Sequence, residues 1–273
     1  MEGTSSMTGE SRFISDRRGR EEASWADEED WNAGAPENVG VTADGLVGRA
    51  PTQDGEAPDS GVSRWTFDNE DTSGSAAIDS WGGNDGSIST GVSTGTSGAN
   101  QTYGTNEAYY LNGDGEVNCG TITEVQGLNS MTLAAWVKYD SIRSFNSSIA
   151  MHTQNDDGWG FTHSDNSSIR FRCETNGSHA SSRTVSINLG QWYHAVGVFD
   201  DNEGRMYLNG TLAAGPDVSN DITVTSVNDP FCIGNQKYRS SRDIPMGVDD
   251  VRIYSKALSD TEIFNLYNTG RIN

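Results

Sequence analysis

The sequence predicts an all-β domain, a sandwich of two antiparallel sheets, preceded by an extended N-terminal arm. Short runs rich in β-branched and aromatic residues recur from Ser63 onward, and turn residues separate them. Helix signals are almost absent, apart from a capping pattern over residues 259–262. Hydrophobic residues make up 33% of the 273 residues, which suits a thin sandwich core better than a large α/β core.

The predicted strands are joined at several points by Asn-Gly, the strongest short hairpin signal, as at Asn112-Gly113, Asn176-Gly177 and Asn209-Gly210. One short helix is expected to follow Ser259. We expect strands near residues 63–67, 86–90, 107–111, 116–119, 131–138, 147–152, 158–163, 168–173, 181–187, 192–199, 204–208, 222–226, 231–235 and 245–254. The expected core includes Trp136, Val137, Trp192, Val196, Val198, Val251 and Ile253.

Residues 1–61 differ in composition from residues 62–273. They are rich in Glu, Asp, Gly, Ser and Pro, and their only aromatic residues are Phe13, Trp25 and Trp31. A segment with so little apolar content cannot bury enough surface to fold alone. We therefore predict that residues 1–61 are an arm for assembly or anchoring, ordered by partner proteins that bury the three aromatic residues, and that residues 62–273 form the head.

The chain is strongly acidic. It has 39 Asp and Glu against 18 Lys and Arg, a net charge of -21, and only three of the cations are lysines. Nucleic acid and anionic membrane surfaces are disfavoured as partners, because both repel such a protein. The composition is typical of proteins from extreme salt, where the screening length falls to roughly 3 Å. An ordinary acidic protein is the alternative.

No segment has the length to span a bilayer, so membrane insertion is not expected. The N-terminus lacks the basic start and apolar run of a secretory signal. Either a signal was removed earlier, or the protein leaves the cell by another route, as a virion component released by lysis does.

Three cysteines, Cys119, Cys173 and Cys232, lie in predicted strands. Their odd number excludes complete internal pairing, and no C-x-x-C spacing indicates zinc. We expect buried free thiols, with a single disulfide as the alternative.

Four segments of the chain follow one another in a characteristic order: residues 65–68 with 78–86, residues 131–137, residues 190–200 and residues 247–263. Their order and spacing resemble those of the LamG-like, or concanavalin A-like, jelly-roll family, and the resemblance covers residues 62 to 270. The resemblance implies a jelly-roll head of the kind found in surface proteins of haloarchaeal tailed viruses. Residues 31–47 also resemble the beginnings of some haloarchaeal viral and cell-surface proteins, in which an attachment arm precedes such a head.

The resemblance implies a structural calcium site. In this family the opening strand pairs with the closing strand, which places Asp68 beside Asp249 and Asp250, and the loop that contains Asp79 covers that edge. Carboxylate oxygens from separate segments suit calcium, which accepts six to eight oxygens at flexible angles. The alternative is that these four aspartates are solvated turn residues in an acidic chain.

Catalysis is not expected, and we identify no catalytic residue. The E-x-D-x-x-E signature of related glucanases is absent, as is the S-x-D-x-G-x-T-W box of sialidase propellers. The histidines lie in no catalytic motif, and His194 in its predicted core strand is interpreted as a packed structural residue. The four histidines are His152, His163, His179 and His194.

Carbohydrate binding needs exposed aromatic faces beside amides and carboxylates at loop tips. Trp81 is expected to be exposed because glycines follow it, whereas Trp159 could instead belong to the core. The predicted ligand-binding residues are Trp81, Asn84, Asn155, Asp157, Trp159 and Tyr238.

These observations predict a non-enzymatic virion surface protein of a halophilic archaeal virus, either a capsid turret or decoration or a tail adsorption component. Residues 1–61 would bind other virion proteins in a homo-oligomeric or multicopy assembly, and the head would bind a host cell-surface glycan or glycoprotein. The alternatives are a cellular or secreted carbohydrate-binding module or adhesin at the cell surface, and a purely structural capsid decoration without a ligand.

Overall fold

The computed structural model describes residues 39–42, 45–48, 58–99, 107–143, 146–152, 157–175, 178–218, 223–224, 228–234 and 244–269. The chain divides between Pro51 and Thr52 into two compact units. In the first unit, β1 (Val39–Thr42) and β2 (Gly45–Gly48) form an antiparallel hairpin. The predicted anchors Phe13, Trp25 and Trp31 lie outside the described residues.

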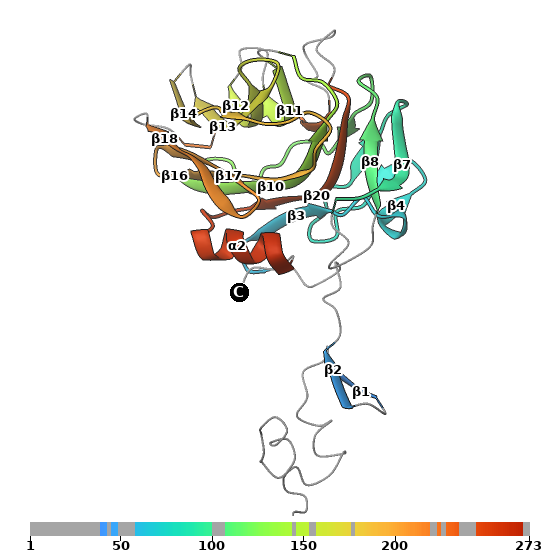
Figure 1. The fold of residues 1–273 in the computed structure, drawn as a ribbon. Coiled ribbons are helices and arrows are strands. Elements are labelled where there is room, and N and C mark those ends of the chain that lie inside the picture. Colours follow the sequence, from blue (N-terminus) through green and yellow to red (C-terminus); the bar gives the residue numbers. More distant parts are fainter. Residues whose placement is uncertain are drawn as a thin grey trace, which may run out of the picture. The chain divides into compact units, whose positions relative to one another are not determined.

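The second unit is the predicted sandwich of antiparallel sheets (Figure 1). In the first sheet, β20 pairs with β10 along one side and with β3 and β8 along the other; β16, β17 and β18 continue from β10, and β7 pairs with β8. Its strands are β3 (Gly61–Trp65), β7 (Val92–Ser97), β8 (Glu107–Leu111), β10 (Ser130–Tyr139), β16 (Tyr193–Asp200), β17 (Glu203–Leu208), β18 (Thr211–Val218) and β20 (Met246–Tyr254).

The second sheet follows the order β4, β5, β6, β9, β19, β11, β12, β13 and β14, and the pairing of β14 with β18 joins it to the first sheet. The short strand β15 pairs with β13. The bounds are β4 (Thr72–Ser73), β5 (Ala76–Ala77), β6 (Gly86–Ile88), β9 (Val117–Asn118), β11 (Asn146–His152), β12 (Gly158–His163), β13 (Ser168–Thr175), β14 (Ser178–Ser182), β15 (Val185–Ser186) and β19 (Phe231–Ile233).

Most predicted strands are confirmed within a few residues. β7 was not predicted, because its Ser, Thr and Gly composition lacks the usual strand signal. The strand expected at residues 222–226 lies mostly outside the described residues. The predicted C-terminal helix is α2 (Asp260–Thr269). It begins with a capping box, in which the Glu262 N–H donates to Ser259 Oγ (3.3 Å) and the Ser259 N–H donates to Glu262 Oε2 (3.1 Å).

The first sheet is buried on its inner face and on part of the opposite face. Its inner face meets the second sheet in the main core, which contains Val137, Val251 and Ile253. Part of its opposite face, which we call the outer face, packs against Ile263 and Leu266 of α2. Figure 1 shows the helix next to this sheet, and the strand residues that it packs against belong to β10, β16, β17 and β20. Val196 and Val198, although buried as predicted, belong to this smaller cluster beneath α2.

Two predicted core tryptophans lie on the outer face. Trp136 is buried there, with its ring centroid 5.7 Å from that of Tyr267 of α2. Trp192 is only half-buried, so its assignment to the core was wrong. Its neighbour Tyr193 enters the inter-sheet core instead, because successive residues of an extended chain point to opposite faces.

All three cysteines are buried with free thiols, which agrees with the first of the two expectations. Burial raises the pKa of the Cys119 thiol. A protonated, buried thiol is a poor nucleophile, and it contributes here as a small apolar side chain.

Candidate functional site

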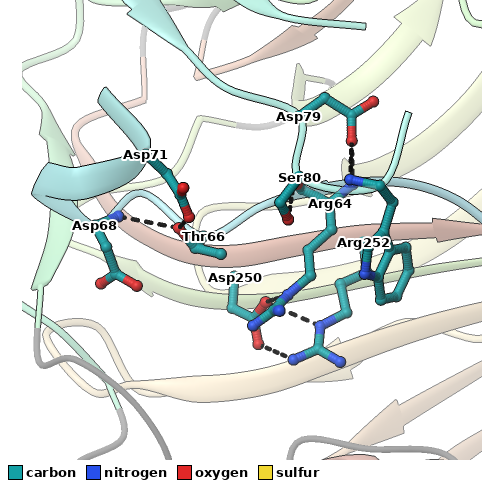
Figure 2. Close-up of polar contacts among 9 residues, drawn as sticks. Arg64, Thr66, Asp68, Asp71, Asp79, Ser80, Asp250 and Arg252 are labelled. Atoms are coloured by element: carbon teal, nitrogen blue, oxygen red, sulfur yellow. Dashed lines mark hydrogen bonds and ion pairs between the residues drawn. The ribbon is translucent and has the colours of Figure 1, made fainter. Parts of the chain in front are cut away.

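A buried cluster of charges lies where the opening strand meets the closing strand. Arg64 of β3 is paired with Arg252 of β20 across the sheet. Asp250 accepts hydrogen bonds from the Nε of Arg64 (2.8 Å) and the Nε of Arg252 (2.9 Å), and a further one from Arg252 Nη2 (Figure 2). The exposed fractions of the three residues are 2%, 4% and 6% for Arg64, Arg252 and Asp250. The carboxylate therefore holds together two like charges that face each other.

A β-bulge places Asp250 in this cluster. The register between β10 and β20 shifts between Ala134 and Trp136, and Asp250 has a φ of +48°. Aspartate adopts this left-handed conformation more readily than most residues. Burial alone raises the pKa of Asp250, but the charges and hydrogen bonds of the two arginines outweigh burial and hold it well below its usual range.

Asp79 fixes the loop formed by residues 79–85 against β3. Its Oδ1 accepts the backbone N–H of Arg64 (2.8 Å), of Trp81 (3.1 Å) and of Gly82 (3.0 Å). Its Oδ2 accepts the backbone N–H of Asn84 (3.1 Å). Four donors occupy this buried carboxylate, so the loop has a preformed shape.

The structure corrects the expected exposure of Trp81, which is half-buried. Its ring lies edge-on to Tyr254, with centroids 5.4 Å apart. The guanidinium carbons of Arg64 and Arg252 lie 6.0 and 5.7 Å from the ring centroid. The indole thus covers the charge cluster and gains cation–π stabilisation.

Asn84 lies beside Trp81 on the same loop and is also half-buried. Its side-chain amide donates to Ser63 Oγ (2.9 Å) and to the exposed side chain of Glu124 (3.0 Å). The loop and its neighbour therefore bring an indole, an amide and a carboxylate to one part of the surface, and these are the groups that bind sugars.

The other predicted ligand-binding residues do not join this group. Trp159 is fully buried and stacks on Phe231, with ring centroids 5.2 Å apart, so its prediction as a ligand-binding residue was wrong. Its place in β12 turns the ring into the core. Asp157 is half-buried just before β12. Asn155 and Tyr238 lie outside the described residues.

Asp68 and Asp249, two of the four predicted calcium ligands, are buried near Asp250. Burial and then the charge of Asp250 raise the pKa of both, for Asp68 to about 7. One oxygen of Asp249 accepts the backbone N–H of Ala99 (3.0 Å). A bound cation would reduce the electrostatic repulsion that Asp68 and Asp249 experience from Asp250. The other two predicted ligands, Asp79 and Asp250, already accept hydrogen bonds from protein groups.

No group of three or more His, Cys, Asp or Glu side chains within the described ranges is arranged to hold a metal ion. A cation at Asp68 and Asp249 would therefore need backbone oxygens or water as its remaining ligands.

His194 lies packed on the outer face, in agreement with its interpretation as a structural residue. It is buried, and its ring centroid lies 5.1 Å from that of Trp136 and 5.9 Å from that of Tyr267. Burial lowers its pKa to about 3. The ring is therefore neutral at ordinary pH.

Arg64 and Arg252 were not predicted from the sequence as site residues. The sequence did contain a signal, because Arg252 lies between the apolar residues Val251 and Ile253 in a strand whose residues are all buried. A charged residue at such a position requires a buried partner, and Asp250 is two residues away.

Residues 111–264 match the sequence model of the Concanavalin A-like lectin/glucanases superfamily. The chain belongs to this superfamily. The match begins at the end of β8 and includes the closing strand β20 and the first half of α2. The curated proteins compared with the chain include no match to its sequence.

Solved structures share the fold. Trypanosoma rangeli sialidase in complex with sialic acid is 19% identical, with a TM-score of 0.56 over 88% of this chain and 36% of that one. The botulinum neurotoxin serotype D binding domain is 15% identical, with a TM-score of 0.58 over 77% of this chain and 52% of that one. Domain 4 of AbnA, an extracellular arabinanase from Geobacillus stearothermophilus in complex with arabinotriose, is 18% identical, with a TM-score of 0.52 over 76% of this chain and 98% of the domain.

The chain spans about a third of the sialidase chains that it matches, for which the covered share is 33% in one case and 35% in another. At these identities the similarity shows the jelly-roll fold alone. In the part of the chain that the structure describes, no helix is long and apolar enough to cross a membrane.

Proposed function

We propose that residues 62–273 form a non-enzymatic, glycan-binding head, and that the loop formed by residues 79–85 is its binding site. The observation that carries the proposal is the fixed position of Trp81 and Asn84, held by Asp79 on a domain of the lectin superfamily. A sugar ring would stack on the accessible part of the indole, and its hydroxyl groups would bond to the amide and to Glu124. The arabinotriose complex of domain 4 of AbnA supports this role.

We further propose that the head is displayed on the virion surface of a halophilic archaeal virus, where it binds a host glycan or glycoprotein. The acidic composition and the weakly apolar residues 1–61 support this setting, with residues 1–61 binding other virion proteins in a multicopy assembly. A secreted or cell-surface carbohydrate-binding module remains the second candidate, and the arabinanase domain favours it.

Calcium is proposed as a structural ion at Asp68 and Asp249, the two carboxylates with raised pKa. An ion bound only by the folded protein would raise the melting temperature with increasing calcium concentration. An Asp68→Asn variant should lose that increase. Equal melting temperatures with calcium and with a chelator would exclude the site.

A glycan array, probed in molar KCl with the full chain and a Trp81→Ala variant, tests the binding function. Trp81→Ala should lose the signal of at least one glycan that the full chain binds, whereas Phe264→Ala, which changes an exposed aromatic residue on α2, should keep every signal. No signal for the full chain would contradict glycan binding. Equal signals for the unmodified chain and for Trp81→Ala would show that the binding site lies elsewhere. Release of sugars from the same glycans would overturn the non-enzymatic assignment.

Detection of the chain in purified virions tests the proposed setting. Mass spectrometry of virions from a haloarchaeal culture should find the chain, and a variant without residues 1–61 should fold but fail to join particles. Presence of the chain only in the medium of uninfected cells would favour the secreted module.

A further inference from the structure

A row of polar and aromatic residues crosses the outer face of the first sheet beyond the part that α2 covers. Tyr110 of β8 pairs with Gly247 of β20, and Gly247 pairs with Lys138 of β10. Trp192 immediately precedes β16, the next strand of the sheet. Because adjacent strands lie about 4.8 Å apart, four strands spread this row over roughly 14 Å, enough for a short oligosaccharide.

All four positions of this row, Tyr110, Gly247, Lys138 and Trp192, lie on the outer face, because the residues next to them in the chain lie on the inner face. Successive side chains of a strand point to opposite faces, so a residue between two core residues faces outward. The neighbours found in the inter-sheet core are Tyr109, Leu111, Val137, Tyr139, Tyr193, Met246 and Val248.

Gly247 allows the indole of Trp192 to lie against the sheet. A Cβ atom at Gly247 would lie 3.0 and 3.1 Å from two atoms of the Trp192 ring, closer than ordinary van der Waals contact. The ring is half-buried, and the Nζ of Lys138 lies 5.6 Å from its centroid. The sheet and the lysine thus fix the indole in one orientation before any ligand arrives.

Hydrogen-bonding groups flank the indole. The hydroxyl of Tyr110 donates to Asp140 (2.9 Å), whose side chain is exposed at the end of β10. Lys138 and Asp140 supply a donor and an acceptor close to an aromatic face. Their charges cancel locally, within a chain of net charge -21 that repels anions.

We propose that Trp192, Lys138, Tyr110 and Asp140 form a second glycan-binding surface that takes a neutral sugar. The C–H face of a sugar ring stacks on Trp192, while its hydroxyl groups accept from Lys138 and donate to Asp140. This inference rests on the proposed glycan-binding function, but it concerns a different surface from the loop that contains Trp81.

Calorimetric titrations in molar KCl with arabinotriose, maltotriose, mannotriose and galacturonic acid trimer test the proposal. The protein is the full chain carrying Trp81→Ala, so that the first site is removed. At least one neutral trisaccharide should bind, and adding Trp192→Ala should weaken that binding about tenfold. Adding Lys138→Met should weaken it less, since the methylene stem remains.

Each outcome separates the two proposals. If neither the unmodified chain nor the Trp81→Ala chain binds any of the four trisaccharides, both proposals fail. If only the unmodified chain binds, or if Trp192→Ala leaves the binding of the Trp81→Ala chain unchanged, the second surface fails alone. Preferential binding of the galacturonic acid trimer would overturn the neutral specificity. If Trp192→Ala fails to fold by circular dichroism, Trp192→Met replaces it, because it fills space without an aromatic face.

Discussion

Replacing Asp250 with Asn should destabilise the head by several kcal/mol. Asparagine keeps the shape of the side chain and tolerates a φ of +48°, so the change isolates the charge. It removes the negative charge that lies between Arg64 and Arg252, which are paired across the sheet and almost fully buried. Breaking a buried ion pair in this way costs about 3 to 5 kcal/mol. With a urea m-value of about 2 kcal/mol/M, the unfolding midpoint should fall by about 2 M.

Urea titration in molar KCl, followed by circular dichroism, measures this shift. The matched control is Glu203→Gln, which neutralises a carboxylate paired with Arg205 at the surface, where the two side chains are 37% and 25% exposed. Exposed pairs contribute about 0 to 1 kcal/mol, so this variant should shift the midpoint little. Equal effects of the two substitutions would refute the claim that the buried cluster holds the sheet junction together.

Three further predictions concern the head. Transfer from molar salt to ~0.1 M should lower its melting temperature, because the screening length grows to roughly 10 Å and the carboxylates repel one another; an unchanged value would remove the argument for extreme salt. The folded pKa of Asp68, raised from 3.8 to about 7, means that its contribution to stability is present below pH 3.8 and is lost as the pH rises through 7. With calcium chelated, Asp68→Asn should therefore gain about 2 kcal/mol relative to the unmodified chain as the pH rises from about 4 to 7. This is the screened part of a shift in which one pKa unit equals about 1.4 kcal/mol, and parallel pH profiles in urea titrations would contradict it. Trp136→Ala should cost about 3 to 5 kcal/mol, because it leaves a cavity between the sheet and α2, and a cost below ~1 kcal/mol would show that the ring is not packed there.

The sequence was sufficient to predict the closing strand and its place in the core. Val251 and Ile253 alternate with polar residues, and this period of two identifies the face that meets the other sheet. The helix after it was predictable from the capping box at Ser259 and Glu262, since the same two side chains close the first turn in the structure.

Exposure on the outer face could not be predicted in the same way, because it depends on which segment covers each residue. Trp81 was expected to be exposed and is half-buried over the arginines, whereas Trp192 was expected in the core and is half-buried beyond α2. Local sequence does not record where α2 ends or how the loop after Asp79 folds. The same limit applies to Asp250, whose bulge appears only in the register between β10 and β20.

The charge cluster connects the fold to the proposed binding site. The opening strand contributes Arg64, the closing strand contributes Asp250 and Arg252, and Trp81 lies over both arginines. The position of the indole therefore depends on a junction that forms only when the two ends of the domain pair. Salt affects this junction less than it affects the surface carboxylates, because buried charges are screened much less than exposed ones. A change in salt should accordingly alter the stability of the head while the geometry beneath Trp81 stays the same.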